Sequence, residues 1–455
     1  MKKSRGLTTV ASLVLALVLS PSVGCSRQSP DPIRLTFLDP EWVRIILMES
    51  NVLPDEKWKA FTQKTGIVVK HLPTPETTLD QLDLVRGLLR GGPPSPDVYG
   101  IDVIWTDSLS EDLIDLKPNF TTELPAVDPD EVASYTVKGK LVALPYHSDV
   151  GVLFYRKDLL QEYGYKSPPS TWVQLEKMAE RIQNGERGKG RRDFWGFIWP
   201  GAAGEGLTCN ALEWQVSEGG GHIIEDDKSI SVNNPDAIRT WQRAAHWIGW
   251  ISPPDLLSYE EWEAINAFYS KKAAFYRGWT RNYFQSVEDD PAIRNTYAVT
   301  SIPAGKDGQF TTRGGYGLGV SRAAPHPVEA MELVRFLFRI DSQLRNTASQ
   351  SESRERPDPY EPPTRSNPGS GFTSKWELPK GTRVVSRPSV TTGQKYEDVS
   401  RAYVQAVHSV LLRKTSAPEA AAALEKELVR ITGFKTGPPS RIRAPKGEEH
   451  SAGGS

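Results

Sequence analysis

The chain alternates short apolar runs with longer stretches in which apolar residues recur every three or four positions. The first pattern is typical of β-strands and the second of amphipathic helices. Strands are predicted at 33–38, 67–72, 98–105, 151–156, 194–199 and 273–277. Because predicted strands and helices alternate along the chain, the fold class is predicted to be α/β.

Helix boundaries are marked by capping residues. Apolar side chains share one helical face within 79–89 and within 172–182. Asn234 followed by Pro235 supplies an N-cap and a first-turn proline for a third helix. Capping-box spacing is found at Thr171 with Gln174, Ser258 with Glu261, and Ser416 with Glu419.

The N-terminus has the pattern of an export signal. Basic residues within 2–5 precede an apolar run at 7–19, and small residues lead up to Cys25. This arrangement resembles a lipobox, in which Cys25 becomes the lipidated first residue of the mature chain. An ordinary secretory signal cut nearby is the alternative, because Ser22 stands where lipoboxes usually have leucine.

We therefore predict that 1–24 is a signal peptide, that 26–32 is a tether, and that the protein is exported and anchored to a membrane through lipid on Cys25. Beyond this leader no run approaches the roughly 18 apolar residues that span a bilayer. Two other segments are rich in polar residues, proline and glycine. We expect 346–382 to be an extended wrap over the surface and 436–455 to be a disordered tail.

Length and charge limit the function further. About 430 residues remain after the leader of this 455-residue chain, which is too many for one core, so two lobes are expected. Lys plus Arg number 55 against 56 for Asp plus Glu, and this balance argues against a nucleic-acid partner. With Cys25 lipidated, Cys209 has no disulfide partner and is expected to be a buried apolar side chain.

Tryptophan is concentrated in one part of the chain, with eight of thirteen at 195–279. Most tryptophans lie in cores, because each removes a large apolar area from water. A sugar site also uses flat rings, against which the C–H faces of a pyranose stack. The composition therefore allows both roles for any single tryptophan.

Catalytic signatures are absent from the sequence. The seven histidines form no metal-ligand spacing, and there is no nucleophile elbow, dinucleotide fingerprint or phosphate-binding loop. We predict no cofactor and no metal. A glycoside hydrolase is still possible, because its two acids have no fixed spacing.

Several segments, taken in order, carry a family resemblance. They are PDVYGIDVIW from Pro96, ALPYHSDVGVLFYRKDLLQEYGY from Ala143, FWGFIW from Phe194, EGLTCNALEW from Glu205, ISPP from Ile251, GGYGLGVS from Gly314 and RPS from Arg387. With these segments, the chain resembles the extracellular solute-binding proteins of ABC transporters, in particular the trehalose/maltose-binding branch. The resemblance runs from about Ile33 to Ile431.

The resemblance implies a type II periplasmic-binding-protein fold. Two discontinuous α/β lobes, each a sheet flanked by helices, would enclose a sugar-binding cleft and close about a hinge. The lobes it implies are an N-lobe at 33–144 plus 300–342 and a C-lobe at 145–299 plus 343–435.

The same resemblance suggests sugar contacts residue by residue. Matching positions are Asp102 and Asp149 as acceptors from sugar hydroxyls, Trp279 as a stacking ring, Gly315 and Tyr316 as a glycine–aromatic pair, and Arg387 as a planar donor. Asp39, Glu41, Gln81 and Arg281 are secondary candidates. Arg281 stands where the family has a second aromatic residue, so the sugar class is better supported than the identity of the sugar.

The leading hypothesis is a monomeric lipoprotein that delivers a trehalose- or maltose-like sugar to the transmembrane subunits of an ABC permease. An exported carbohydrate-active enzyme of the glycoside hydrolase type is the first alternative. A sensory or scaffold protein that kept the binding fold and presents its closed form to a signalling partner is the second.

Overall fold

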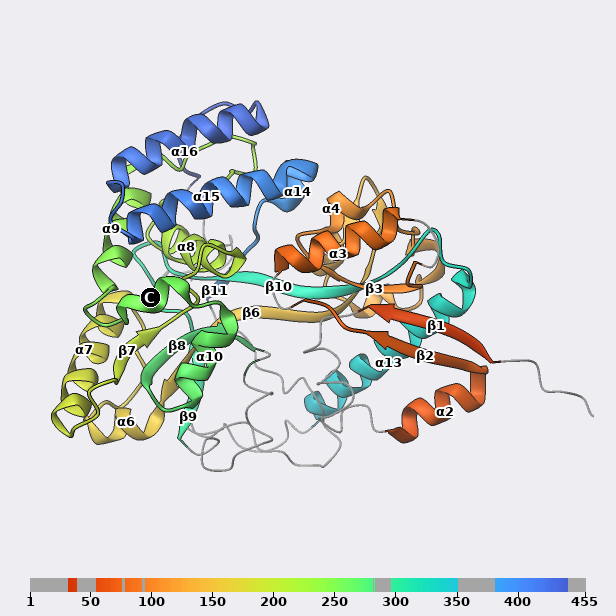
Figure 1. Cartoon of the computed structure of the whole chain (residues 1–455), viewed down its shortest axis with the longest axis horizontal. Coiled ribbons are helices and arrows are strands. Elements are labelled where there is room, and N and C mark those ends of the chain that lie inside the picture. Colours follow the sequence, from red (N-terminus) through yellow and green to blue (C-terminus); the bar gives the residue numbers. More distant parts are fainter. Residues whose placement is uncertain are drawn as a thin grey trace, which may run out of the picture.

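A computed structural model describes residues 32–38, 55–75, 78–91, 95–280, 282, 296–350 and 381–440. Two regions lie side by side and are joined by two long strands, β6 (Leu144–Arg156) and β10 (Gln309–Val320) (Figure 1). Helices flank the sheet in both regions, so the predicted α/β class is confirmed. We call the region around β1 (Ile33–Leu38) the N-lobe and the region around α8 (Glu205–Ser217) the C-lobe.

The remaining N-lobe elements, in chain order, are α2 (Asp55–Thr65), β2 (Ile67–Leu72), α3 (Thr78–Arg90), β3 (Val98–Asp102), α4 (Thr106–Leu109), the 3-10 turns η1 (Lys117–Asn119) and η2 (Leu124–Ala126), α5 (Pro129–Ser134), β4 (Thr136–Val137), β5 (Lys140–Leu141) and α13 (Pro327–Gln350).

The remaining C-lobe elements are α6 (Lys157–Glu162), α7 (Trp172–Gly188), β7 (Trp195–Ile198), α9 (Pro235–Trp247), η3 (Pro254–Ser258), α10 (Glu261–Tyr269), β8 (Ala273–Trp279), β9 (Tyr297–Ser301), β11 (Thr382–Val385), α14 (Ser389–Thr392), η4 (Gly393–Lys395), α15 (Tyr396–Leu411) and α16 (Ala417–Thr432).

One sheet runs through both lobes. Among the described residues its order is β2-β1-β3-β10-β6-β8-β7, with β11 beside β10 and β9 beside β6. The second half of β10 pairs with β3 of the N-lobe, whereas its first half pairs with β11. Likewise, β6 pairs with β10 through 144–150 and with β8 through 151–155. These two strands therefore carry the chain between the lobes.

Each lobe has its own apolar core. One cluster includes Leu35, Tyr99 and Leu333, and the other includes Phe154, Trp214 and Tyr403. Both clusters draw on distant parts of the chain, because β10 and the segments after it return to pack against earlier elements. The lobe boundaries suggested by the resemblance stay a prediction.

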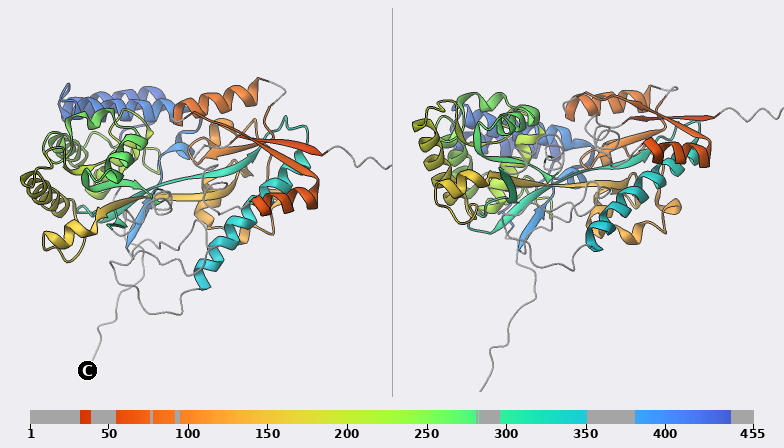
Figure 2. Two further views of the ribbon diagram at one scale, coloured as in Figure 1. Left: turned by 60° about the horizontal axis from the view of Figure 1, so that its bottom comes forward. Right: turned by 90° about the horizontal axis from the view of Figure 1, so that it is seen from below.

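The C-terminal helices also reach the N-lobe. Gln394 of η4 donates its side-chain N–H to the Asp107 carbonyl at 2.9 Å, and Arg86 of α3 pairs with Glu397 of α15. In two further views, α3 and α15 lie on the same side of the molecule (Figure 2). The lobes thus contact each other outside the connecting strands.

The strand predictions were correct where the local pattern was clear. β1 and β2 have the predicted bounds, but β3 ends at Asp102 and β6 begins seven residues before the predicted start. β9, β10 and β11 were missed. β10 contains Gly314, Gly315 and Gly317, and glycines interrupt the residue pattern that predicts a strand.

Close contacts explain these glycines. A Cβ at Gly314 would lie 2.8 Å from the Trp279 ring, and one at Gly317 would lie 2.8 Å from the Tyr135 ring. Glycine in a strand interior marks such close approaches. β10 is therefore a strand in spite of its glycines.

All three predicted capping boxes lie in described residues. Half of the box at Thr171 forms, because the Thr171 hydroxyl accepts the Gln174 N–H at 3.2 Å whereas the Gln174 side chain accepts from the Ser170 N–H. Ser416 and Glu419 form the predicted capping box. The box predicted at Ser258 was wrong, because the helix starts later and Glu260 with Glu263 caps α10. Ser258 instead ends η3, where its hydroxyl donates to the Asp255 carbonyl.

The segments predicted to be loose differ in part from expectation. Residues 346–350 belong to α13, so the extended wrap does not begin at 346, and 351–380 lie outside the described residues. Residues 436–440 are also ordered, because Gly437 donates its N–H to the Ile230 carbonyl at 3.0 Å and Ser440 bonds Glu225. The rest of the predicted tail lies outside the described residues.

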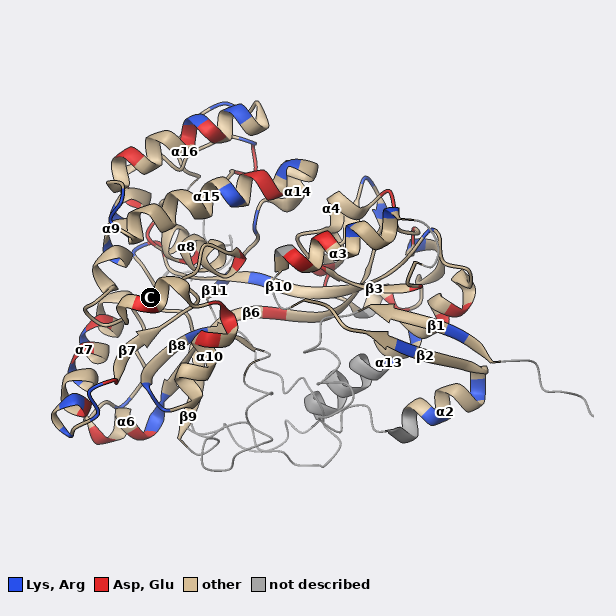
Figure 3. Ribbon diagram, in the orientation of Figure 1, with Lys and Arg blue, Asp and Glu red and all other residues tan. Residues whose placement is uncertain are grey.

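The surface charges are mixed on both lobes. Lys and Arg alternate with Asp and Glu along the helices (Figure 3). In the described part of the chain, no helix is both long and apolar enough to cross a bilayer. The described His, Cys, Asp and Glu side chains likewise form no group of three that could hold a metal ion.

Candidate functional site

The predicted contact residues gather where β3, β6, β8 and β10 meet. Pairing of β10 with β3 places Tyr316 opposite Asp102, and pairing with β6 places Gly314 opposite Asp149. On the other side of β6, Gly151 lies opposite Trp279 of β8. Residues separated by more than 200 positions therefore meet at the junction between the lobes.

Asp102 and Arg387 approach each other across this junction. Asp102 is the last residue of β3, and its Oδ1 accepts the backbone N–H of Ile104 at 3.2 Å. The Arg387 Nη2 lies 3.9 Å from the same oxygen. Both side chains are largely buried, with exposed fractions of 11% for Asp102 and 4% for Arg387.

Arg387 is held mainly by the C-lobe. Its Nη1 donates to Glu205 Oε1 at 3.0 Å, and its Nη2 donates to the Arg313 carbonyl at 3.2 Å. Among the described residues its Nε has no hydrogen-bond partner, although it is buried. Burial acts to lower the pKa of Arg387, but the surrounding acidic groups, including Glu205 and Asp102, raise it overall. The guanidinium is therefore a buried cation, and its Nε is the nitrogen that makes no hydrogen bond among the described residues.

Glu205 also belongs to the candidate site. The sequence analysis includes it in the segment EGLTCNALEW but assigns it no role. It is the first residue of α8 and accepts hydrogen bonds from Arg387, from the Tyr396 hydroxyl and from the Ser400 hydroxyl, the last at 2.7 Å. The only local sign of its importance is an acidic residue in the first turn of a helix, where the helix dipole favours a negative charge. Its partners lie more than 180 positions later, so local pattern could not identify them.

Tyr316 reaches the N-lobe side of the junction. Its hydroxyl donates to Gln81 Oε1 at 3.2 Å, and its ring meets the Trp105 ring edge-on at 6.0 Å. Gln81 of α3 in turn donates to the Pro75 carbonyl at 2.8 Å. The two predicted contacts Tyr316 and Gln81 are thus brought together.

Gly315 has a conformation that favours glycine. Its φ is +129°, and a Cβ would lie 2.3 Å from the His147 carbonyl oxygen. A side chain at this position would be strained and would force the strands apart. Gly315 therefore has a structural role in the junction, whatever its role in ligand contact.

Asp149 is engaged by the protein itself. It is buried on β6, and its Oδ1 accepts bonds from the Thr280 hydroxyl and the Val150 N–H. Its Oδ2 lies 3.9 Å from His147 Nε2. These contacts hold Thr280, the residue after β8, against β6, and a sugar contact by Asp149 stays a prediction.

Trp279 is likewise enclosed. Its indole Nε1 donates to Glu261 Oε1 at 2.6 Å, and the Arg277 guanidinium lies 4.2 Å above its ring. One face of the ring is therefore occupied by Arg277. Stacking on a sugar stays a prediction that could involve only the remaining surface of the ring.

The other predicted positions have no described structure. Asp39, Glu41, Arg281 and Cys25 lie outside the described residues. Their proposed roles stay predictions.

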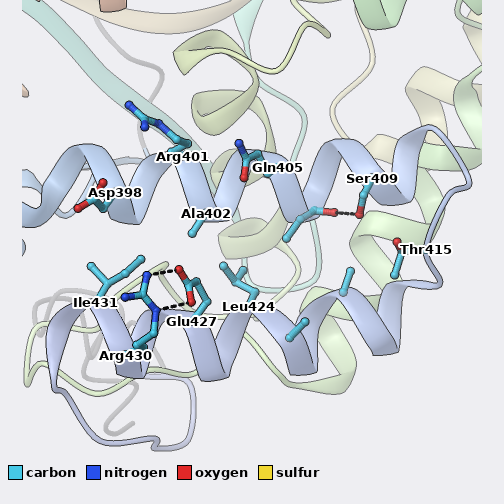
Figure 4. Close-up of a pocket in the computed structure, with 13 residues that line it drawn as sticks. Asp398, Arg401, Ala402, Gln405, Ser409, Thr415, Leu424, Glu427, Arg430 and Ile431 are labelled. Atoms are coloured by element: carbon cyan, nitrogen blue, oxygen red, sulfur yellow. Dashed lines mark hydrogen bonds and ion pairs between the residues drawn. The ribbon is translucent and has the colours of Figure 1, made fainter.

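A separate surface pocket of about 450 Å³ lies between α15 and α16 (Figure 4). Its lining includes Arg401, Gln405, Leu424, Glu427 and Arg430. Arg430 and Glu427 form an ion pair in this pocket at 2.6 Å, and both side chains are exposed. Exposed ion pairs contribute little to the stability of the fold. None of the predicted sugar contacts lines the pocket, so the interlobe cluster is the better candidate site.

Comparisons with known proteins agree with this geometry. Residues 50–344 match the sequence profile of the bacterial extracellular solute-binding proteins. The chain is 38% identical over 376 residues to a probable ABC transporter-binding protein of Deinococcus radiodurans, covering 82% of this chain and 89% of that protein.

Solved structures are similar over most of the chain. Maltose-bound MalE3 of T. maritima is 27% identical, with a TM-score of 0.72 over 88% of this chain and all of that one. A solute-binding protein of Thermotoga lettingae with bound alpha-D-tagatose also has a TM-score of 0.72, covers the same shares, and is 19% identical. The predicted two-lobed periplasmic-binding-protein fold is confirmed.

Proposed function

We propose that this chain, which belongs to the bacterial extracellular solute-binding proteins, captures a neutral sugar between its lobes and delivers it to an ABC permease. The observation that carries the proposal is the approach of Asp102 and Arg387 from opposite lobes to 3.9 Å. Solute binding without chemistry is the activity of this family, and we extend it to this chain.

The chemistry of this pair favours a hydroxyl. A hydroxyl donates one hydrogen bond and accepts others, so one group can donate to Asp102 and accept from Arg387. A carboxylate ligand would be repelled by Asp102, and an ammonium ligand by Arg387. The pair therefore disfavours solutes that carry only one kind of charge, whereas the hydroxyl groups of an uncharged polyhydroxy solute satisfy both side chains.

We further propose that the sugar is maltose- or trehalose-like. The similarity to the maltose-bound protein of T. maritima supports a disaccharide. Tyr316, which lies opposite Asp102 in the pairing of β10 with β3 and bonds Gln81, adds an aromatic ring and polar groups on the N-lobe side of the pair.

A thermal-shift panel tests the function. Maltose, trehalose, mannitol, glutamate and lysine are each added to the purified protein, because a ligand that binds only the folded state raises the melting temperature. We expect a shift with at least one sugar and none with the charged solutes. A shift with glutamate or lysine alone would refute the proposal.

The same samples test the hydrolase alternative. Sugar recovered unchanged after prolonged incubation supports binding, whereas smaller products would make this protein an enzyme. Sugar-dependent shrinkage in small-angle scattering would support closure of the lobes about β6 and β10, and an unchanged radius with bound sugar would contradict it.

We also propose that lipid on Cys25 anchors the monomer to the outer face of a membrane. The support is the apolar run at 7–19, followed within six residues by Gly24 and Cys25. Cys25→Ser should move the protein from the membrane to the soluble fraction. Equal membrane retention of both forms would contradict anchoring.

A further inference from the structure

Arg387 lies in a connection, not on a helix or strand, between β11 and α14. Its backbone is therefore not fixed by a ladder of hydrogen bonds. The direction of its guanidinium depends on the side chains and carbonyl that it contacts. The charged member of that set within hydrogen-bond distance is Glu205, at 3.0 Å.

Glu205 is itself held more firmly than its partner. The helix N-terminus of α8 favours a negative charge at its first residue, and the preceding Gly204 gives no side-chain cap. Tyr396 and Ser400, one turn apart on α15, donate to the two carboxylate oxygens. The Glu205 carboxylate is therefore held by hydrogen bonds that do not involve Arg387.

We propose that Glu205 is a positioning residue for the sugar site, on which the proposed function rests: it orients Arg387 so that the guanidinium faces Asp102 and its Nε–H is left for a ligand hydroxyl. A guanidinium donates in a planar fork, so fixing one edge of the fork fixes the direction of the other N–H groups. Without the Glu205 charge, Arg387 would retain the neutral Arg313 carbonyl at 3.2 Å and the Asp102 carboxylate at 3.9 Å, both near Nη2, and would sample other directions.

A matched control is present in the same lobe. Glu225 is also buried, and it accepts bonds from the His222 N–H at 3.0 Å and from the hydroxyls of Ser231 and Ser440. It contacts no arginine in these bonds. Glu225→Gln thus removes a buried, hydroxyl-bonded carboxylate without touching Arg387.

The first measurement needs no sugar. The ¹H–¹⁵N signal of the Arg387 Nε–H is assigned by its loss in Arg387→Lys, and the Arg277 Nε–H, bonded to Glu213 at 3.0 Å, serves as an internal reference. We expect Glu205→Gln to broaden the Arg387 signal while the Arg277 signal stays sharp. Glu225→Gln should leave both sharp. An unchanged Arg387 signal in Glu205→Gln would overturn the proposal.

Calorimetric titration with maltose, or with the sugar of the panel that gives the largest shift, then measures the effect on binding. Glu205→Gln should weaken the affinity roughly ten- to a hundredfold, as expected for a charge-assisted hydrogen bond to the ligand that is no longer aimed. Glu225→Gln should bind like wild type. Equal losses in the two variants would refute a specific role of Glu205.

Milder variants cover the case in which Glu205→Gln does not fold. Ser400→Ala and Tyr396→Phe each remove one donor to the carboxylate and should broaden the Arg387 signal partially. No broadening in either variant would overturn the proposal. A wild-type protein that binds no sugar would refute the proposed function, while the signal of Arg387 would still decide whether Glu205 orients it.

Discussion

Helix α8 carries two glutamates that each pair with an arginine, and the two pairs differ in how completely the C-lobe encloses them. Glu213 binds Arg277 of β8 through both oxygens, at 2.6 and 3.0 Å, and also accepts from the backbone N–H and hydroxyl of Thr312. Both side chains are at most 1% exposed. This pair lies wholly within the C-lobe.

The Glu205–Arg387 pair is a single hydrogen bond by comparison. Arg387 comes from a connection, and its guanidinium also approaches Asp102 of the N-lobe. Each arginine has one nitrogen without a hydrogen-bond partner among the described residues, but the Arg277 guanidinium lies over the Trp279 ring. Both pairs are buried, so burial does not distinguish them; Arg387 is the candidate binding group because its guanidinium approaches the other lobe.

Breaking the enclosed pair should have the largest effect on stability. Glu213→Gln leaves Arg277 buried without an anionic partner, which costs about 3–5 kcal/mol of unfolding free energy. Urea unfolding followed by circular dichroism measures the change. Glu205→Gln should cost clearly less, because Arg387 lies beside a second carboxylate, and an equal loss in both variants would mean that both pairs are structural.

Arginine-to-lysine changes should separate the two pairs by function. Arg387→Lys keeps the charge but loses the planar fork, so sugar affinity should fall by about 1.5–3 kcal/mol, roughly ten- to 150-fold. Arg277→Lys should lower the melting temperature and leave the affinity of the folded protein nearly unchanged. Calorimetric titration and thermal melts of both variants measure this, and a normal affinity in Arg387→Lys would remove Arg387 from the site.

Sequence reasoning identified those parts of the fold whose pattern is local. β1, β2 and the Asn234 cap of α9 follow from neighbouring residues, and the structure confirms them. β10 was missed because its glycines are required by the Trp279 ring, the His147 carbonyl and the Tyr135 ring, which are distant in sequence.

The candidate site shows the same division. The resemblance pointed to Asp102 and Arg387, and the structure brings them together. It did not assign Glu205, because its donors Arg387, Tyr396 and Ser400 follow 182 to 195 positions later. Interactions that depend on the docking of α15 against α8 cannot be read from local spacing.

Two glycines next to the pairs offer a smaller, steric comparison. A Cβ at Gly151 would lie 2.2 Å from Glu213 Oε1 and 2.3 Å from Arg277 Nη2. Gly151→Ala should therefore displace the enclosed pair and cost about 1–3 kcal/mol in urea unfolding. Gly204→Ala, beside Glu205, is the control, because its Cβ would come no closer than 3.2 Å to its nearest neighbour, the Glu260 carboxylate. A similar loss of unfolding free energy in both variants would show that displacement of the Glu213–Arg277 pair does not cause the loss in Gly151→Ala.

The smallest expected effect is on the reactivity of the Cys209 thiol, which lies between the two pairs. It lies on α8 four residues after Glu205 and four before Glu213, on the same helical face, and is 1% exposed. Burial raises the pKa of its thiol to about 12, so the thiol stays protonated at pH 8 in the folded protein.

In a Cys25→Ser background, alkylation of Cys209 by iodoacetamide at pH 8 should therefore be slow and should occur through opening of the C-lobe. Glu213→Gln should accelerate it more than Glu205→Gln does, because the enclosed pair contributes more to the closed state. Rapid alkylation of the folded parent protein, or equal rates in the two variants, would show that α8 opens independently of these pairs.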